Sequence, residues 1–143
     1  MEFLRILVVD DSLITVKKLS SMLSLLGHKV VMTAGTGKEA LAAYEECNPD
    51  LVTMDITMPD MDGIEATRLI RERFPDALIV MVTSHGQEKM VLDALQAGAK
   101  GYVLKPFRQD KLHEVIEMSL KRSIRPDKLR EVAEGKESTA PGE

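Results

Sequence analysis

Cysteine and aromatic residues are scarce in this chain of 143 residues, which has one cysteine, no tryptophan and only 3% aromatic side chains. The single Cys47 excludes an internal disulfide framework and fits a reducing compartment, so we expect a cytoplasmic protein. No apolar run approaches the roughly 18 residues that a membrane helix needs, and the first residues lack the form of a signal peptide. We therefore expect no membrane insertion.

The chain also lacks a block of basic residues, and its formal net charge is −4. Nucleic-acid surfaces depend on clustered lysine and arginine, so this balance argues against nucleic acid as a partner. The hydrophobic content of 44% is ordinary for a globular protein, and the length suffices for one domain with its own core.

Short apolar runs alternate with segments that have helical periodicity, and this alternation predicts an α/β protein. Strands are expected at residues 4–9, 29–33, 50–54, 77–82 and 101–104. Helices are expected at residues 13–26, 37–47, 63–74, 87–97 and 108–123. The pattern indicates a doubly wound, five-stranded parallel sheet with helices on both faces. We expect one domain over residues 1–123, followed by a polar tail over 124–143 with a short helix at 127–134.

Residues at the helix ends support these boundaries. Gly27 and Gly98 are expected to end the first and fourth helices in the left-handed conformation. The segment Thr36-Gly37-Lys38-Glu39 reads as a capping box at the start of the second helix, and Asp62 with Glu65 reads as another at the third.

Four of the expected strands end in a polar or charged side chain. The first ends at Asp10 and Asp11, the third at Asp55, the fourth at Thr83 and the fifth at Lys105. The carboxyl ends of parallel strands share one edge of the sheet, where open α/β sheets bind their ligands. Three adjacent carboxylates repel one another unless a cation neutralises them, and oxygen ligands suit Mg²⁺, with Mn²⁺ as an alternative. The set therefore predicts a site for a divalent cation and a phosphoryl group.

These residues resemble a known family. The motifs at residues 8–12, 55–59 with Asp62-Gly63, Thr83 and 105–107 look like those of the receiver domain of two-component response regulators. The resemblance covers residues 4 to about 122, and residues 52–59 look especially like the CheY-like, single-domain chemotaxis regulators. It implies the strand order 2-1-3-4-5 and a cis peptide bond between Lys105 and Pro106.

The resemblance also implies a role for each site residue. Asp55 would accept a phosphoryl group from a phosphohistidine, because carboxylates act as nucleophiles in aspartyl-phosphate chemistry. Asp11, Asp55 and the backbone carbonyl of Thr57 would bind the Mg²⁺ ion directly, and Asp10 would act largely through water. Lys105 would place its positive charge on the phosphoryl group.

A second group of residues would report the phosphorylated state. By resemblance, the hydroxyl of Thr83 would bind a phosphoryl oxygen, and Tyr102 would then turn inward and change a protein-binding face. Thr57, Ser84 and His85 would rim the site and tune how water reaches the phosphoryl group. His85 would either contact the phosphoryl group or sit exposed.

The implied protein is a signalling module rather than a dedicated enzyme, with at most self-phosphorylation and self-dephosphorylation. Its expected partners are a sensor histidine kinase and a downstream protein such as a flagellar motor switch protein. A receiver in another phosphorelay is the first alternative to chemotaxis.

Other functions remain open from the sequence. A phosphatase of the dehalogenase superfamily would share Asp55, Thr83 and Lys105, but residue 57 is threonine where that family has a second acid. A binding module that no longer takes phosphate is the third hypothesis. Separately, Asp10-Asp11 could be no more than a helix cap at a strand end, with Asp11 or Ser12 as the capping residue.

Overall fold

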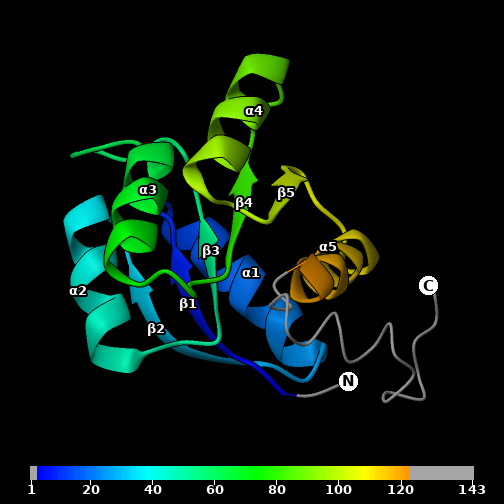
Figure 1. The fold of residues 1–143 in the computed structure, drawn as a ribbon. Coiled ribbons are helices and arrows are strands. Elements are labelled where there is room, and N and C mark those ends of the chain that lie inside the picture. The colour runs from blue at the N-terminus through cyan, green and yellow to red at the C-terminus, as the bar shows by residue number, and fades with distance from the viewer. Residues whose placement is uncertain (1–2, 123–143) are drawn as a thin grey trace, which may run out of the picture.

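Strands and helices alternate strictly in the computed structural model, which describes residues 3–122 (Figure 1). The five strands are β1 (Arg5–Val9), β2 (Lys29–Ala34), β3 (Leu51–Met54), β4 (Ile79–Thr83) and β5 (Gly101–Leu104). The five helices are α1 (Leu13–Leu25), α2 (Gly37–Cys47), α3 (Gly63–Arg73), α4 (Glu88–Ala97) and α5 (Gln109–Arg122). The expected α/β class is confirmed.

All neighbouring strands run parallel, and the sheet has the order β2-β1-β3-β4-β5, which confirms the strand order that the resemblance implied. A parallel sheet needs a crossover between consecutive strands, and α1, α2, α3 and α4 each supply one, while α5 follows the last strand. The chain order reverses beside β1, whose neighbours are β2 and β3. Open α/β sheets bind ligands in the crevice at this kind of position.

Helices cover both faces of the sheet, and the sheet separates the core into two layers. In Figure 1, α2, α3 and α4 lie on one face of the sheet, and α1 and α5 lie on the other. One core cluster joins the sheet to side chains such as Tyr44 and Ile70, and the second joins it to Leu19 and Ile116. Every residue of β3 and β4 is buried. Strands covered on both faces need apolar residues at consecutive positions, as these runs have.

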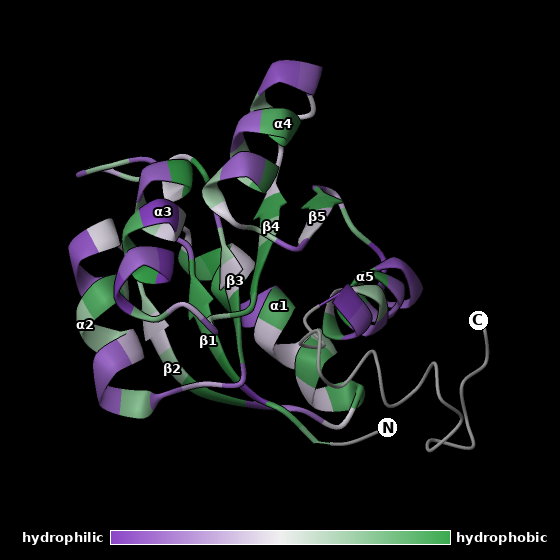
Figure 2. Ribbon diagram, in the orientation of Figure 1, coloured by the Kyte–Doolittle hydropathy of each residue, from purple (hydrophilic) through white to green (hydrophobic). Residues whose placement is uncertain are grey.

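Figure 2 shows the same division by hydropathy, with the central strands coloured as hydrophobic and the helices mixed along their length. The helices bury only their apolar stripe, and in α3 this stripe contains Ala66 and Ile70. None of the helices within residues 3–122 combines the length and the apolar character needed to cross a membrane.

The predicted helix ends are confirmed at several positions. Gly27 and Gly98 have φ angles of 94° and 118°, which a side chain would strain. Asp62 accepts a hydrogen bond from the Glu65 amide at 2.8 Å, as a capping residue should. The segment 36–39 differs from the standard capping box in one respect, because the Glu39 carboxylate accepts from the amide of Gly35.

Most of the predicted elements have a boundary that differs from the structure by one or two residues. The fourth strand begins at Ile79 and includes Thr83, because Val82 and Thr83 both pair with β5. The fifth helix begins at Gln109. The tail predicted over 124–143, with its short helix, lies outside the described residues.

Candidate functional site

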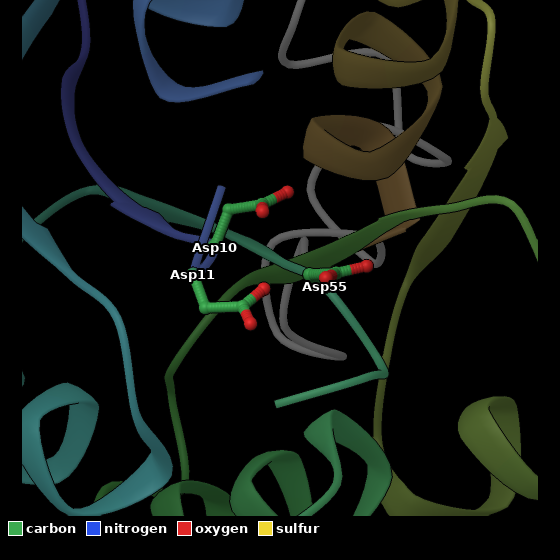
Figure 3. Close-up of side chains that lie close together, drawn as sticks. All are labelled: Asp10, Asp11 and Asp55. Atoms are coloured by element: carbon green, nitrogen blue, oxygen red, sulfur yellow. The ribbon is translucent and has the colours of Figure 1, made fainter. Parts of the chain in front are cut away.

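The register of the sheet brings three carboxylates to one edge. Val9 pairs with Met54 at the ends of β1 and β3, so the next residues, Asp10 and Asp55, leave the sheet side by side. The amide of Asp55 donates to the Val9 carbonyl at 3.0 Å and holds this alignment. Figure 3 shows Asp10, Asp11 and Asp55 extending from these two strand ends into one region.

The three carboxylates are close enough to share a cation. Each offers one oxygen, and these oxygens all lie within 4.8 Å of one another. Asp10 and Asp55 are buried, at 4% and 7% exposure, while Asp11 is exposed. A set of carboxylate oxygens, partly open to water, suits a hard divalent ion such as Mg²⁺, which keeps several water ligands. The residues therefore fit the predicted metal site.

Lys105 supplies the positive charge at this edge. Its ammonium nitrogen lies 2.9 Å from an oxygen of Asp10 and 3.5 Å from an oxygen of Asp55. The amide of Lys105 donates to the carbonyl of Thr83, and the peptide bond to Pro106 is cis, as predicted. Lys105 pairs with two of the three clustered carboxylates, so this cluster retains an excess of negative charge.

Burial raises the pKa of the Asp55 carboxyl above its usual value of 3.8. The neighbouring Asp10 carboxylate raises it further, and Lys105 opposes both effects. Binding a cation, or reacting with an electrophile, relieves the unfavourable negative charge of a carboxylate that is held in a buried, acidic environment. Raised carboxyl pKa values also gather at functional sites.

Helix capping at this edge falls to Ser12, whose hydroxyl accepts from the amide of Thr15. One oxygen of Asp10 accepts from the Ser12 amide at 2.9 Å, while the other binds Lys105. Ser12 is thus the capping residue, as one form of the helix-cap interpretation expected, but capping does not explain why Asp10 binds Lys105.

Thr83 and Tyr102 are connected through one residue of the β4–α4 loop. Thr83 is fully buried at the end of β4, and its hydroxyl accepts from the amide of His85 at 3.3 Å. The hydroxyl of the partly buried Tyr102 donates to the carbonyl of His85 at 2.6 Å. Tyr102 also packs against the core that α2, α3 and α4 cover.

The predicted rim residues lie on the two loops beside Asp55. Thr57 is exposed in the β3–α3 loop, and Ser84 and the half-buried His85 follow β4. The Thr57 hydroxyl and the His85 ring form a hydrogen bond of 2.7 Å between these loops. His85 therefore bonds to Thr57 across the rim, and its contact with a phosphoryl group stays a prediction.

Two supports of the site were not predicted from the sequence. A Cβ atom on Gly63 would lie 1.9 Å from the Asp55 carbonyl oxygen, so α3 can start against the acceptor only with glycine there. Asp60 accepts hydrogen bonds from the amides of Gly37 and Lys38 at 2.8 and 2.9 Å, tying the β3–α3 loop to the start of α2. Asp60 and Gly63, both close to Asp55 in sequence, were the available signals, but the amides that Asp60 accepts from are 22 and 23 residues away.

Comparison with known proteins agrees with this geometry. Residues 6–117 match the family model described as the response regulator receiver domain. The chemotaxis protein CheY of Bacillus subtilis is 46% identical over 116 residues, which cover 81% of this chain and 97% of that protein.

Solved structures give the same result. A LuxR-family two-component response regulator from Aurantimonas has a TM-score of 0.81 at 37% identity, and the match covers 94% of this chain and 99% of that one. A CheX–CheY–BeF₃–Mg²⁺ complex from Borrelia burgdorferi has a TM-score of 0.76 at 36% identity, covering 85% and 90%. This chain belongs to the family of response regulator receiver domains and is a CheY-like member of it.

Proposed function

We propose that Asp55 accepts a phosphoryl group from the phosphohistidine of a sensor histidine kinase. One observation carries the proposal: the Asp55 carboxylate stands at the carboxyl edge of the sheet, beside two further carboxylates and the Lys105 ammonium. Buried carboxylates that have no function rarely cluster with other carboxylates, because their like charges repel one another. The receiver family match supports the same chemistry.

Asp11, Asp55 and the backbone carbonyl of Thr57 would hold a Mg²⁺ ion, with Asp10 acting largely through water; Mn²⁺ is an alternative occupant. The bound ion supplies positive charge that offsets the charge on the transferring phosphoryl oxygens. The shared reach of the three carboxylates supports this assignment.

In the transfer, an oxygen of the Asp55 carboxylate forms a bond to phosphorus while the bond from phosphorus to the histidine nitrogen breaks. The electron pair of the broken bond stays on the imidazole of the kinase, which leaves as neutral histidine after taking up a proton. The Lys105 ammonium, now 3.5 Å from Asp55, is placed to bind an oxygen of the incoming group. Releasing Lys105 from its carboxylate partners accompanies this step.

Thr83 and Tyr102 would carry the signal away from Asp55. A phosphoryl oxygen would take the Thr83 hydroxyl as a donor and draw the β4–α4 loop toward the site, and Tyr102 follows that loop through the His85 carbonyl. Thr57, Ser84 and His85 rim the acceptor and control the approach of water. The output is therefore a change of protein-binding surface, with no product released.

Chemotaxis is the pathway we propose, because the most similar curated relatives include CheY proteins. The target would be a protein such as a flagellar motor switch protein, and the setting would be the cytoplasm. Residues 1–123 would act as the whole receiver. A receiver in a different phosphorelay is the alternative, and it shares every step up to the target.

Intact-protein mass spectrometry after treatment with acetyl phosphate tests the proposal. We expect a gain of one phosphoryl group that depends on Mg²⁺ and is lost in Asp55→Asn. Retained labelling in Asp55→Asn would contradict the assignment of the acceptor. Repeated turnover of a sugar phosphate would instead favour a phosphatase, although Thr57 stands where the dehalogenase superfamily has its second acid.

A further inference from the structure

Three hydrogen bonds meet at His85 and connect parts of the chain that lie far apart in sequence. The ring nitrogen Nε2 and the Thr57 hydroxyl are 2.7 Å apart, joining the β4–α4 loop to the β3–α3 loop. The amide of His85 donates to the Thr83 hydroxyl, and its carbonyl accepts from the Tyr102 hydroxyl. His85 therefore contacts the rim, the strand end and the aromatic residue at once.

The Thr57 side of this connection is well fixed. The β3–α3 loop is closed by a 2.7 Å hydrogen bond from the Gly63 amide to the Ile56 carbonyl. Asp60 anchors the same loop to the first two amides of α2. A hydrogen bond from this loop to the His85 ring therefore restrains the β4–α4 loop.

The position of Tyr102 depends on that restraint. Its hydroxyl bonds to a backbone carbonyl of the β4–α4 loop, so the placement of that loop favours the orientation in which the ring packs against the core. Burial raises the pKa of Tyr102, so the hydroxyl remains protonated and able to donate at neutral pH.

We propose that Thr57 and His85 are positioning residues whose hydrogen bond holds Tyr102 in the core-facing orientation without help from a phosphoryl group. The inference rests on the proposed function for its meaning, because Tyr102 is the residue that would report phosphorylation. The Thr57–His85 bond favours the inward orientation of Tyr102, which phosphorylation would also favour. Both therefore shift the same equilibrium between the inward and outward orientations of Tyr102. Phosphorylation then increases the population of inward Tyr102 by a smaller amount.

One hydrogen bond of ordinary strength changes such an equilibrium by roughly 2- to 13-fold. Losing the Thr57–His85 bond should reduce the ratio of inward to outward Tyr102 by that factor. Because Thr57 is exposed, its substitution by valine removes the hydroxyl with little cost to packing. Thr57→Ser keeps the hydroxyl and is the matched control.

Fluorine NMR of the full chain labelled with 3-fluorotyrosine measures this ratio directly, because the sequence has only two tyrosines. Tyr44 is buried and stacks near Phe74, with ring centroids 4.7 Å apart, so its signal reports that each variant is folded. We expect Thr57→Val and His85→Ala to move the Tyr102 signal toward that of free fluorotyrosine. Thr57→Ser should leave the signal at the wild-type position.

An unchanged Tyr102 signal in Thr57→Val, with Tyr44 unchanged, would overturn the inference. A shift of equal size in Thr57→Ser would do the same, because the hydroxyl would then not be responsible. Adding Mg²⁺ and beryllofluoride to the same samples tests the proposed function separately. Beryllofluoride binding without any effect of Thr57→Val would leave the phosphoacceptor standing and remove the positioning role. A Tyr102 shift in Thr57→Val without any beryllofluoride binding would contradict the proposed phosphoacceptor and leave the positioning role of Thr57 and His85 standing.

Discussion

Neutralising Asp55 should make the protein more stable when no divalent cation is present. Asp55→Asn keeps the shape of the side chain and removes one charge from a group of three carboxylates. Because burial and Asp10 both raise the pKa of Asp55, the ionised carboxylate opposes folding at neutral pH. The variant is expected to unfold at higher denaturant concentration than the wild type.

The distances give the size of the effect. At an effective dielectric constant of about 20, two carboxylates whose oxygens lie within 4.8 Å of each other repel by at least about 3.5 kcal/mol. Lys105, at 3.5 Å from Asp55, attracts it by about 4.7 kcal/mol on the same scale. The combined repulsion of two carboxylates therefore exceeds the attraction of Lys105. Asp11 is exposed and its repulsion is reduced by water, so the net gain in Asp55→Asn is about 1–2 kcal/mol.

The gain should depend on pH in a defined direction. A carboxyl whose folded pKa lies above 3.8 binds its proton more tightly in the folded state, so the fold is disfavoured above that raised pKa. The penalty diminishes as the pH falls through the raised pKa and is absent below 3.8. The difference between the variant and the wild type should close over the same range.

Urea unfolding with a chelator, at neutral pH and at several lower values, measures this difference. The matched control is Asp76→Asn, an exposed residue in the turn between α3 and β4 at the opposite edge of the sheet. The control should change stability by less than about 0.5 kcal/mol. Equal or lower stability of Asp55→Asn at neutral pH, with the control unchanged, would refute the electrostatic reasoning.

Other perturbations follow from the same contacts. Mg²⁺ at ten times its dissociation constant should stabilise the wild type by about 1.4 kcal/mol, and Asp55→Asn by less, in thermal melts at matched ionic strength. Gly63→Ala should cost about 2–3 kcal/mol in urea unfolding, because its Cβ would meet the Asp55 carbonyl oxygen at 1.9 Å. Asp60→Asn leaves one acceptor oxygen for the amides of Gly37 and Lys38. In the wild type these two amides lower the pKa of Asp60. The wild type should therefore melt at a higher temperature than the variant at neutral pH, and this difference should disappear as the pH falls through the lowered pKa. Burial lowers the pKa of His28, so wild-type stability should decrease as the pH falls below 6.5. His28→Asn, which keeps an acceptor for the Leu4 amide, should decrease less in chemical denaturation between pH 7.5 and 5.5.

Local features of the fold could be predicted because their causes are local. The buried strands β3 and β4 can be recognised in the sequence as runs of mostly apolar residues. Gly27 and Gly98 end helices because glycine alone adopts their φ angles without strain. Boundaries were less certain: Thr83 joins β4 because β5 pairs with it, and that pairing depends on residues some 20 positions later.

The strand order was available only through the family resemblance. Alternating strands and helices are compatible with several parallel sheets, since each crossover reaches either neighbouring position. In the folded chain β1 lies between β2 and β3, and this placement sets Asp10 beside Asp55.

The sequence by itself determined the chemistry available to this protein: carboxylates, a hydroxyl and a lysine, each at or just after the end of an apolar strand. It also determined their common edge, because parallel strands end on the same side. Only the tertiary structure decided the pairwise contacts, such as Thr57 with His85 and Asp60 with the start of α2. Those contacts depend on how two loops meet in space, and side chains 22–28 residues apart leave no periodic signal of their meeting in the sequence.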